Sequence, residues 1–330
     1  MDVHNLDREA GKIFVTGGSG IIGNRIVTKL MNTGYAHVRL GTSNTESLDY
    51  MTDKGAAEVV EFSWKREETF ANALHGIKSV IITIPYEQHW YKNFAKFLKA
   101  CKIANVKHFV KLSFYLSHVN GLRHIPFVKN HLHCDEILMR LIMPDEEYLS
   151  QMSYTILSAS HFMSNQTVNY GVELNGTDAS KNMYSATKNR AANYISPNDI
   201  AEATVRVVLS PQDHYNRIYT LLGPELITCL GVTQYMSKFY GKKLHHTDVS
   251  FAKYRNILIE AGVAWWEVNE RMAMQRVTAS GLEENITWCM RNDFHQICCH
   301  RPESFAEYLT NIKSMTPMEL GQSTKHFMFV

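Results

Sequence analysis

Short hydrophobic runs alternate with amphipathic segments along the first half of the chain. The runs have the length and β-branched content of strands, and we predict strands at residues 12–16, 37–42, 58–63, 79–84, 108–113 and 154–158. The segments between them repeat apolar residues at helical spacing, and we predict helices at residues 21–31, 67–74, 90–104 and 128–142. This alternation predicts an α/β fold, a Rossmann-type doubly wound parallel sheet.

The pattern changes after residue 160. Residues 165–190 are polar and irregular, and a helix is predicted at 197–209, where Pro197 and Asp199 occupy the first turn. A strand at 218–222 follows, and from Cys229 onward the chain is mostly helical. We therefore expect a dinucleotide-binding domain over residues 1–160, to which the strand and helix around 194–222 return. A smaller, mostly helical cap that binds the substrate is expected over residues 161–330, partly interleaved with the first domain.

Composition narrows the class of partner. The 330 residues are 45% hydrophobic and 20% charged, as in ordinary globular proteins, and the formal net charge is only +2. Without a dense basic cluster we expect neither nucleic acid nor a membrane as partner, but a small molecule. No apolar run approaches the length of a spanning helix, and the first ten residues lack a signal-peptide core. A cytoplasmic monomer or homodimer is expected.

The six cysteines are scattered, which in the cytoplasm is typical of free thiols. His295, Cys298, Cys299 and His300 lie close together in sequence. Two adjacent cysteines are poorly placed to serve one tetrahedral zinc ion. We therefore expect no metal site.

A glycine-rich loop joins the first predicted strand to the first helix. Gly17, Gly20 and Gly23 are spaced as Gly-x-x-Gly-x-x-Gly, which permits a tight turn, close approach of a pyrophosphate and close helix packing. The helix N-terminus adds free N–H groups and a positive dipole end. We expect this loop to bind a nicotinamide dinucleotide through Gly17, Gly18, Ser19, Gly20, Ile21, Ile22 and Gly23.

The end of the second strand bears on the choice between NAD and NADP. An acidic residue there would bind the ribose 2′-hydroxyl and repel a 2′-phosphate, but none occurs before Glu46. Thr42, Ser43 and Asn44 supply hydroxyls and an amide, and Arg39 lies upstream. NADP(H) is therefore favoured over NAD(H). The alternative for Arg39 is a solvated strand residue without a role in cofactor binding.

Five segments spread along the chain match one family: TGGSGIIG at 16–23, VKHFVKLS at 106–113, YTILSASHFMSN at 154–165, SPNDIAEA at 196–203 and YTLLGPELIT at 219–228. Through them the chain resembles the NmrA-like atypical short-chain dehydrogenases over nearly its whole length. FSWKREETFANAL at 62–74 and MYSATKN at 183–189 are most similar to the festuclavine and agroclavine dehydrogenases of ergot alkaloid pathways. The resemblance implies an NADPH-dependent reductase of an iminium, an imine or a conjugated C=C bond. Two departures are Ser43, where the family often has Arg, and Ala159-Ser160 in place of Arg-Pro.

The Tyr-x-x-x-Lys pair of ordinary short-chain dehydrogenases is missing from the expected helix. Ile125 stands four residues before Lys129, and the matches at 50–54 and 184–188 lie elsewhere in the chain. A tyrosine is needed to protonate the alkoxide formed from a carbonyl. Hydride transfer to an iminium carbon gives a neutral amine, so no general acid is required. Binding and orientation of the two reactants can supply much of the catalysis.

The carboxyl ends of the predicted parallel strands indicate which residues could form the active site. Ligands bind outside the carboxyl ends of parallel strands, so we expect Ile84, Pro85 and Ser113 beside the cofactor. Lys129, which could also contact the cofactor, and His131 are candidates for a polar catalytic role, with helix capping or solvent exposure as the alternative; His131 matches a histidine that recurs in the alkaloid reductases. Tyr115 is a third candidate proton donor. Expected substrate contacts are Tyr86, Phe114, Tyr115, Phe162, Met163 and Trp265.

Core packing is the alternative for Phe162 and Met163, and also for the cap tryptophans Trp265, Trp266 and Trp288, which could instead stack on a flat or cationic substrate. Two other functions remain open at this point, because fold alone does not fix function. One is an NADP(H)-binding redox sensor without turnover, and the other is a cyclase or isomerase that consumes no cofactor.

Overall fold

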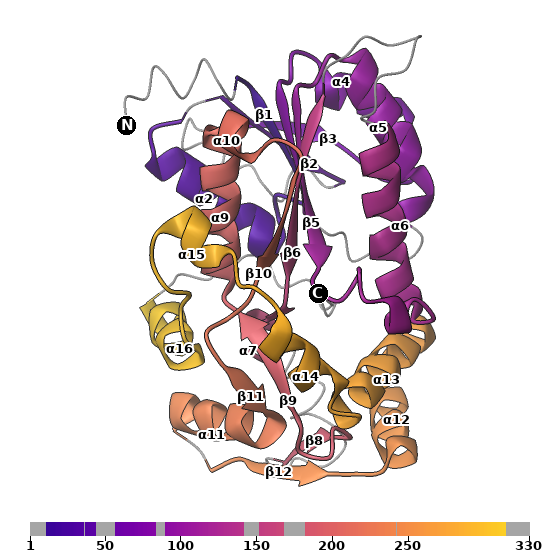
Figure 1. Cartoon of the computed structure of the whole chain (residues 1–330), viewed down its shortest axis with the longest axis vertical. Helices are drawn as coiled ribbons and strands as arrows, with labels where there is room; N and C mark the ends of the chain where they lie inside the picture. The colour runs from indigo at the N-terminus through magenta and orange to yellow at the C-terminus, as the bar shows by residue number, and fades with distance from the viewer. Residues whose placement is uncertain are drawn as a thin grey trace.

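A computed structural model describes residues 11–35, 37–43, 57–83, 90–141, 152–167, 182–241 and 243–314. Seven strands form one parallel sheet in the order β10-β6-β5-β4-β1-β2-β3 (Figure 1). Its members are β1 (Ile13–Thr16), β2 (Val38–Thr42), β3 (Ala57–Glu61), β4 (Ser79–Ile82), β5 (His108–Phe114), β6 (Ser153–Ala159) and β10 (Arg217–Leu221). The strand order reverses beside β1, as in a doubly wound sheet. The predicted fold class is confirmed.

Helices cover both faces of this sheet. One face carries α2 (Ile21–Asn32) and α9 (Pro197–Leu209), and the other carries α4 (Glu68–Leu74), α5 (Phe94–Ile103) and α6 (Pro126–Leu141) (Figure 1). A 3-10 turn, η2 (Trp90–Asn93), precedes α5, and a second, η3 (Asn120–Leu122), precedes α6. Strand side chains alternate between two cores: Ile13 and Val15 face the α2 side, whereas Phe14 packs edge-on against Phe62 at 5.4 Å between ring centroids.

Helix α9 and strand β10 return to the large sheet after the chain has entered the cap. Strand β10 pairs with β6 in parallel, and α9 packs against α2. The predicted start of α9 is confirmed, because Ser196 Oγ accepts a hydrogen bond from the amide of Asn198 at 3.1 Å and Pro197 follows it. The short α10 (Pro211–His214) then connects α9 to β10.

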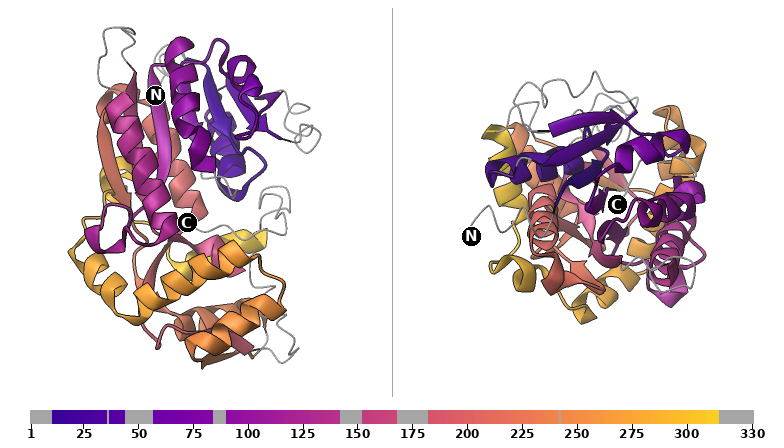
Figure 2. Two further views of the ribbon diagram at one scale, coloured as in Figure 1. Left: turned by 90° about the vertical axis from the view of Figure 1, so that its right-hand side faces the viewer. Right: turned by 90° about the horizontal axis from the view of Figure 1, so that it is seen from above.

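The cap lies at the end of the sheet toward which the arrowheads of β5 and β6 point (Figures 1 and 2). It contains a three-stranded sheet of β7 (His161–Phe162), β9 (Ala191–Ile195) and β11 (Leu226–Thr228), and a two-stranded sheet of β8 (Asn182–Ser185) and β12 (His245–Asp248). Its helices are α7 (Met163–Thr167), α11 (Cys229–Tyr240), α12 (Phe251–Glu260), α13 (Trp265–Ala279) and α14 (Leu282–Cys289). The sequence analysis missed these cap strands.

The last two described helices return to earlier elements. Helix α15 (Phe294–Cys298) packs against α9, and α16 (Phe305–Ser314) packs against α11. Both the sheet domain and the cap therefore depend on the end of the chain. Among the described helices, none combines the length and the apolar content that crossing a bilayer requires.

Glu270 makes the stability of the cap depend on pH. Burial, reinforced by the nearby Glu267 carboxylate, raises the pKa of Glu270 to about 7. The folded state therefore holds a proton that the unfolded chain loses near pH 4.5, so this stabilisation is present at low pH and is lost as the pH rises through about 7. We expect Glu270→Gln to match the wild type at low pH and to melt at a higher temperature in alkaline buffer. Melting curves across the pH range measure this, with the exposed Glu68→Gln as control; parallel wild-type and Glu270→Gln profiles would contradict it.

Candidate active site

The glycine loop between β1 and α2 has the geometry of a phosphate-binding turn. Gly17 has φ +62°, a left-handed conformation that favours glycine, and its amide donates to the Gly41 carbonyl at 3.1 Å. A Cβ atom on Gly23 would lie 2.2 Å from the carbonyl oxygen of Gly17. Only a residue without a side chain at position 23 allows the helix to start so close to the loop.

The N-terminus of α2 offers backbone donors at this loop. Gly20 precedes the helix, and within the described part of the chain no side chain caps this end. The side chains of Ile21 and Ile22 are buried in the core, so these residues present their backbone to the loop. Uncapped first-turn N–H groups and the positive end of the helix dipole suit an anion such as a pyrophosphate. Gly17, Gly18, Ser19, Gly20, Ile21, Ile22 and Gly23 thus lie together as one turn.

Thr83, which directly follows β4, packs against the glycine loop. Its hydroxyl donates to the Thr16 carbonyl at 2.8 Å, and a Cβ on Gly17 would lie 2.6 Å from the same hydroxyl oxygen. Sequence reasoning missed Thr83, although a hydroxyl side chain directly after a buried strand was a usable signal. The expected cofactor residues Ile84 and Pro85, and the expected substrate residue Tyr86, lie outside the described residues.

Thr42 and Ser43 stand at the carboxyl end of β2, beside the loop. Thr42 is buried and its carbonyl accepts from the amide of Phe62 at 2.8 Å, whereas Ser43 is exposed. Asn44 lies outside the described residues. At this strand end Ser43 is therefore the accessible polar side chain that a ribose or a 2′-phosphate could reach.

Arg39 does not occupy the expected position beside the cofactor. It lies near the start of β2, and its Nη1 donates to the carbonyls of Asn72, Ala73 and His75 at 3.2, 3.0 and 2.8 Å, at the C-terminal end of α4. Its Nη2 pairs with Glu58 at 3.0 Å. Arg39 is 5% exposed, so it is not a solvated residue either. It anchors α4 to the sheet, and the expectation of a 2′-phosphate contact is corrected.

Ser113 belongs to a buried ion-pair network between β5 and α6. Lys111 Nζ lies 2.7 Å from Asp135 Oδ1, and neither side chain is exposed to solvent. The Ser113 hydroxyl donates to Asp135 Oδ2 at 2.7 Å, and His118 Nε2 lies 3.2 Å from that oxygen. Burial opposes ionisation, but Lys111, His118 and Ser113 hold the pKa of Asp135 below its ordinary value. The Ser113 hydroxyl is therefore engaged with Asp135 on α6, and its place beside the cofactor stays a prediction.

His131 is unsuited to donating a proton. It is fully buried, its ring lies 4.7 Å from that of Phe127 and 5.8 Å from that of Trp90, and its two nitrogens have no hydrogen-bond partner among the described residues. Burial, helped by the charge of Lys111, holds the pKa of His131 well below its ordinary value. The imidazole packs in the core beside Phe127 and Trp90, and a catalytic role for His131 stays a prediction that this burial disfavours.

Lys129 is exposed on the first turn of α6, where it forms no ion pair with another described residue. Ile125, which stands where the family tyrosine would be expected, is buried in the main core. The Tyr184–Lys188 match lies on β8 and the turn after it, in the cap. No described tyrosine and lysine therefore form the usual catalytic pair on α6.

Tyr115, after β5, donates its hydroxyl to the buried Glu283 at 2.5 Å. His161 Nε2 lies 2.9 Å from the same carboxylate oxygen, and Thr278 donates to the other at 2.7 Å. Burial and the Glu283 carboxylate raise the pKa of Tyr115 well above its ordinary value. Although burial opposes ionisation, His161, Tyr115 and Thr278 hold the pKa of Glu283 below its ordinary value. The Tyr115 proton is thus committed to Glu283.

This group, which we call the junction network (Tyr115, His161, Thr278 and Glu283), ties the sheet domain to the cap. It joins the end of β5 and strand β7 to α13 and α14. Its histidine is 13% exposed at the side chain, so His161 is the member that reaches toward solvent. Sequence reasoning missed His161 and Glu283, because no local pattern links residues 161 and 283 before folding.

The expected substrate contacts are mostly core residues. Phe114 is fully buried between Phe127 and His161, with ring centroids at 5.2 and 5.4 Å. Phe162 belongs to the main core and Met163 to the core of the cap. These positions match the core-packing alternative. Phe114 contacts the rings of Tyr115 and His161, at 5.1 and 5.4 Å between centroids, so it packs against the junction network.

Two of the cap tryptophans are exposed to solvent. Trp265 is 59% exposed, and the Arg255 guanidinium lies over its ring at 4.6 Å from the centroid, while Trp288 is 80% exposed. Trp265 thus stacks on a cation of its own chain. The substrate contact expected of Trp265 stays a prediction.

The chain is similar in sequence and in fold to known proteins. A model described as the NmrA-like family matches residues 9–309. Agroclavine dehydrogenase of Claviceps purpurea (strain 20.1) is 28% identical over 282 residues, 83% of this chain and 89% of that protein. The structure of Citrobacter sp. triphenylmethane reductase complexed with NADP(H) has a TM-score of 0.74 at 21% identity, covering 91% of this chain and 99% of that one. NADPH-dependent quinone oxidoreductase of Escherichia coli, complexed with NADPH, has a TM-score of 0.75 at 18% identity, covering 92% and 100%. The chain belongs to the NmrA-like family.

Proposed function

We propose that this protein is an NADPH-dependent reductase that transfers hydride to an iminium, an imine or a conjugated C=C bond of a small, flat substrate. The glycine loop supports the cofactor part of the proposal. A side chain larger than hydrogen at Gly17 or Gly23 would clash with neighbouring atoms. The loop also lies at the uncapped N-terminus of α2, where a pyrophosphate can bind. The family and the dehydrogenase and reductase names of its relatives support the reaction class.

The residues present fit a dinucleotide. The loop at 17–23 would hold the pyrophosphate, Thr42 and Ser43 would lie beside the adenosine ribose, and Lys129 would approach from the start of α6. When bound, NADPH supplies a hydride from its nicotinamide ring. We assign cofactor binding to residues 1–160 together with α9 and β10, and coverage of the site to the remainder of residues 161–330. The absence of an acidic residue at 41–43 is what favours NADPH over NADH.

The choice of hydride acceptor rests on whether a side chain near the site can donate a proton. The Tyr115 hydroxyl is bonded to Glu283, and His131 is neutral and enclosed. A ketone would need a proton at the developing alkoxide, for which the junction offers no ready donor. An iminium carbon accepts a hydride and becomes a neutral amine, with no proton transferred. A neutral imine or a conjugated C=C bond would also need a proton, which solvent would have to supply, so this observation favours the iminium. The chain then has only to orient the two reactants and exclude water.

A substrate panel tests this proposal. The purified protein is mixed with NADPH and, separately, with cyclic iminium ions, conjugated enones and simple ketones, and loss of the reduced nicotinamide absorbance is followed. We expect turnover with the iminium ions and none with the ketones. Tight NADP(H) binding with inert substrates would instead favour a redox sensor, and product formed without cofactor loss would favour an isomerase or cyclase.

Replacing Tyr115 by phenylalanine separates structural from catalytic use of its hydroxyl. We expect kcat for an iminium substrate to change by less than about threefold, because the hydroxyl serves Glu283 and not the reacting atoms. Stability should fall by about 1–3 kcal/mol, because a buried carboxylate loses a donor. Steady-state kinetics and urea denaturation measure the two effects. A loss of kcat approaching 100-fold, with the fold intact, would make Tyr115 the proton donor.

A further inference from the structure

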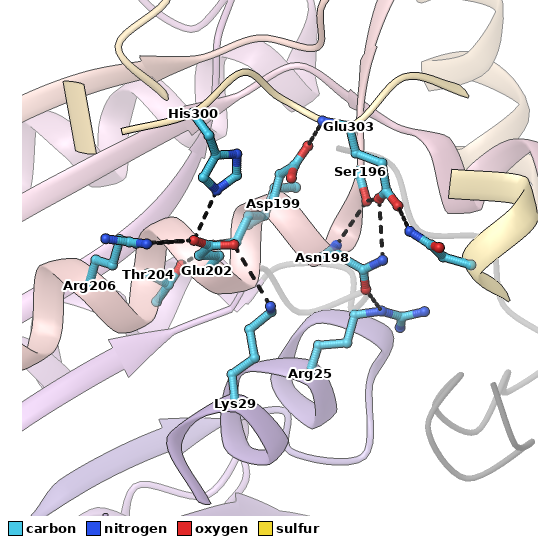
Figure 3. Close-up of polar contacts among 12 residues, drawn as sticks. Arg25, Lys29, Ser196, Asn198, Asp199, Glu202, Thr204, Arg206, His300 and Glu303 are labelled. Atoms are coloured by element: carbon cyan, nitrogen blue, oxygen red, sulfur yellow. Dashed lines mark hydrogen bonds and ion pairs between the residues drawn. The ribbon is translucent and has the colours of Figure 1, made fainter. Parts of the chain in front are cut away.

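Three metal-ligating side chains from separate elements meet on the outer face of α9. Glu202 lies on α9, Cys298 ends α15, and His300 lies in the segment that leads to α16. One ligand atom of each, a carboxylate oxygen, a sulfur and an imidazole nitrogen, lies within 4.8 Å of the others. In Figure 3 the His300 ring stands directly over the Glu202 carboxylate. This cluster is separate from the glycine loop and from the junction network.

The His300 ring is oriented as in metal-bound histidines. Its Nδ1 lies 2.8 Å from the Arg301 carbonyl oxygen, which can only accept, so Nδ1 carries the proton. Nε2 lies 3.1 Å from Glu202 Oε1, which also can only accept, so without a metal this contact is an ion pair with a proton on Nε2. A metal ion would replace that proton. A backbone carbonyl that fixes the tautomer of a ligating histidine is a common outer-shell arrangement.

Cys298 supplies the sulfur from a protected position. It is 1% exposed to solvent. Cys299 is exposed and takes a left-handed backbone conformation with φ +62°. Only Cys298 of the adjacent pair joins the cluster. The sequence analysis excluded a metal because two adjacent cysteines suit one ion poorly, but the third donor is Glu202, almost a hundred residues earlier.

We propose that Glu202, Cys298 and His300 bind a zinc ion, with water in the fourth position. One sulfur, one nitrogen and one oxygen are the donors that Zn²⁺ accepts, and bond lengths of about 2.0–2.3 Å at a tetrahedral angle separate ligand atoms by roughly 3.5 Å. The observed separations need only small side-chain adjustments. Binding forms the Zn–S and Zn–N bonds and releases the thiol proton of Cys298 and the Nε2 proton of His300 to solvent.

The positively charged side chains near Glu202 are compatible with a bound zinc ion. Arg206 lies 3.0 Å from Glu202 Oε1 and Lys29 lies 4.0 Å from Oε2, as Figure 3 shows. Both are long side chains at the surface, so they can shift when an ion takes one carboxylate oxygen. Glu202 and His300 also line an open cavity of about 1030 Å³ between α2, α9 and residues 300–311, which gives the ion a path from solvent. Zinc would fasten α15 to α9, the helix that packs on α2.

Zinc titration tests the proposal. The tag-free, reduced chain is titrated with ZnCl2 against a chromophoric chelator, and Co²⁺ is added separately to detect thiolate-to-cobalt absorption. We expect equimolar binding, a cobalt–thiolate band and a higher melting temperature with Zn²⁺. Cys298→Ser and His300→Gln should each weaken binding on the order of 100-fold and abolish the melting shift. Cys299→Ser is the matched control and should bind like the wild type.

Three results would overturn the site. They are no stoichiometric binding to a folded wild-type chain, binding that survives in Cys298→Ser, or binding that is lost only in Cys299→Ser. Should Cys298→Ser fail to fold, His300→Gln decides, because His300 is at the surface with a side chain 46% exposed. Retention of the cobalt–thiolate band together with unchanged zinc affinity in His300→Gln would also count against the site.

Discussion

Replacing Gly23 by alanine is expected to weaken NADPH binding on the order of 100-fold. The added methyl would lie 2.2 Å from the carbonyl oxygen of Gly17, a backbone atom that cannot rotate away. The loop must therefore move off the start of α2, and the N–H groups that would hold the pyrophosphate lose their common direction. Quenching of protein fluorescence by NADPH, or titration calorimetry, measures the dissociation constant.

Gly121→Ala is the matched control for this substitution. A Cβ atom at Gly121 would meet no heavy atom within 4 Å, so affinity and melting temperature should stay close to those of the wild type. Circular dichroism of Gly23→Ala is needed to show that the sheet has formed. A folded Gly23→Ala protein that binds NADPH with wild-type affinity would show that the loop does not hold the cofactor.

Breaking the buried pair of Lys111 and Asp135 is expected to cause the largest loss of stability. The two charges lie 2.7 Å apart with no solvent exposure. Asp135→Asn keeps the shape and can still accept from Ser113, but it leaves the Lys111 ammonium buried without a counter-charge. Removing one partner of such a pair costs about 3–5 kcal/mol. Urea denaturation gives the change in the free energy of unfolding.

The double variant Lys111→Met, Asp135→Leu is the control for that loss. Apolar side chains of similar volume remove both desolvated charges at once, and such exchanges are often neutral or stabilising. We expect the double variant to be more stable than Asp135→Asn. Equal destabilisation in the two proteins would mean that shape, not the unpaired charge, accounts for the loss.

The sheet and the glycine loop were predictable because their signals are local. Each strand of the large sheet is a short apolar run, and the run at 79–84 predicted β4 without any knowledge of its neighbours. The loop at 17–23 carries its chemistry in its own backbone, so spacing and context were sufficient. Helix α9 was equally clear, because Ser196 and Pro197 mark its start.

The roles of individual polar side chains were not predictable, because distant residues decide them. Arg39 pairs with carbonyls at the end of α4, and Tyr115 is engaged by Glu283 from α14. His131 lies on the expected helix, but the face it occupies turns it toward Trp90 and Phe127. In each case the sequence showed a suitable side chain, and only tertiary packing determined what it contacts.

The cap strands escaped prediction for a related reason. Strand β7 has two residues, and β8 lies in a polar segment that pairs with β12 about sixty residues later. Strands this short gain their stability from partners rather than from their own pattern. Consequently the sequence showed the cap as a mostly helical region without its sheets.

Transfer of deuterium from labelled NADPH tests the central claim most directly. The protein is incubated with NADPH deuterated at C4, on one face of the ring and then on the other, together with a cyclic iminium ion, and the product is examined by mass spectrometry. We predict one deuterium on the former iminium carbon, delivered from one face only. Unlabelled product with both labelled cofactors, or NADPH that remains unconsumed while it is bound, would contradict the account.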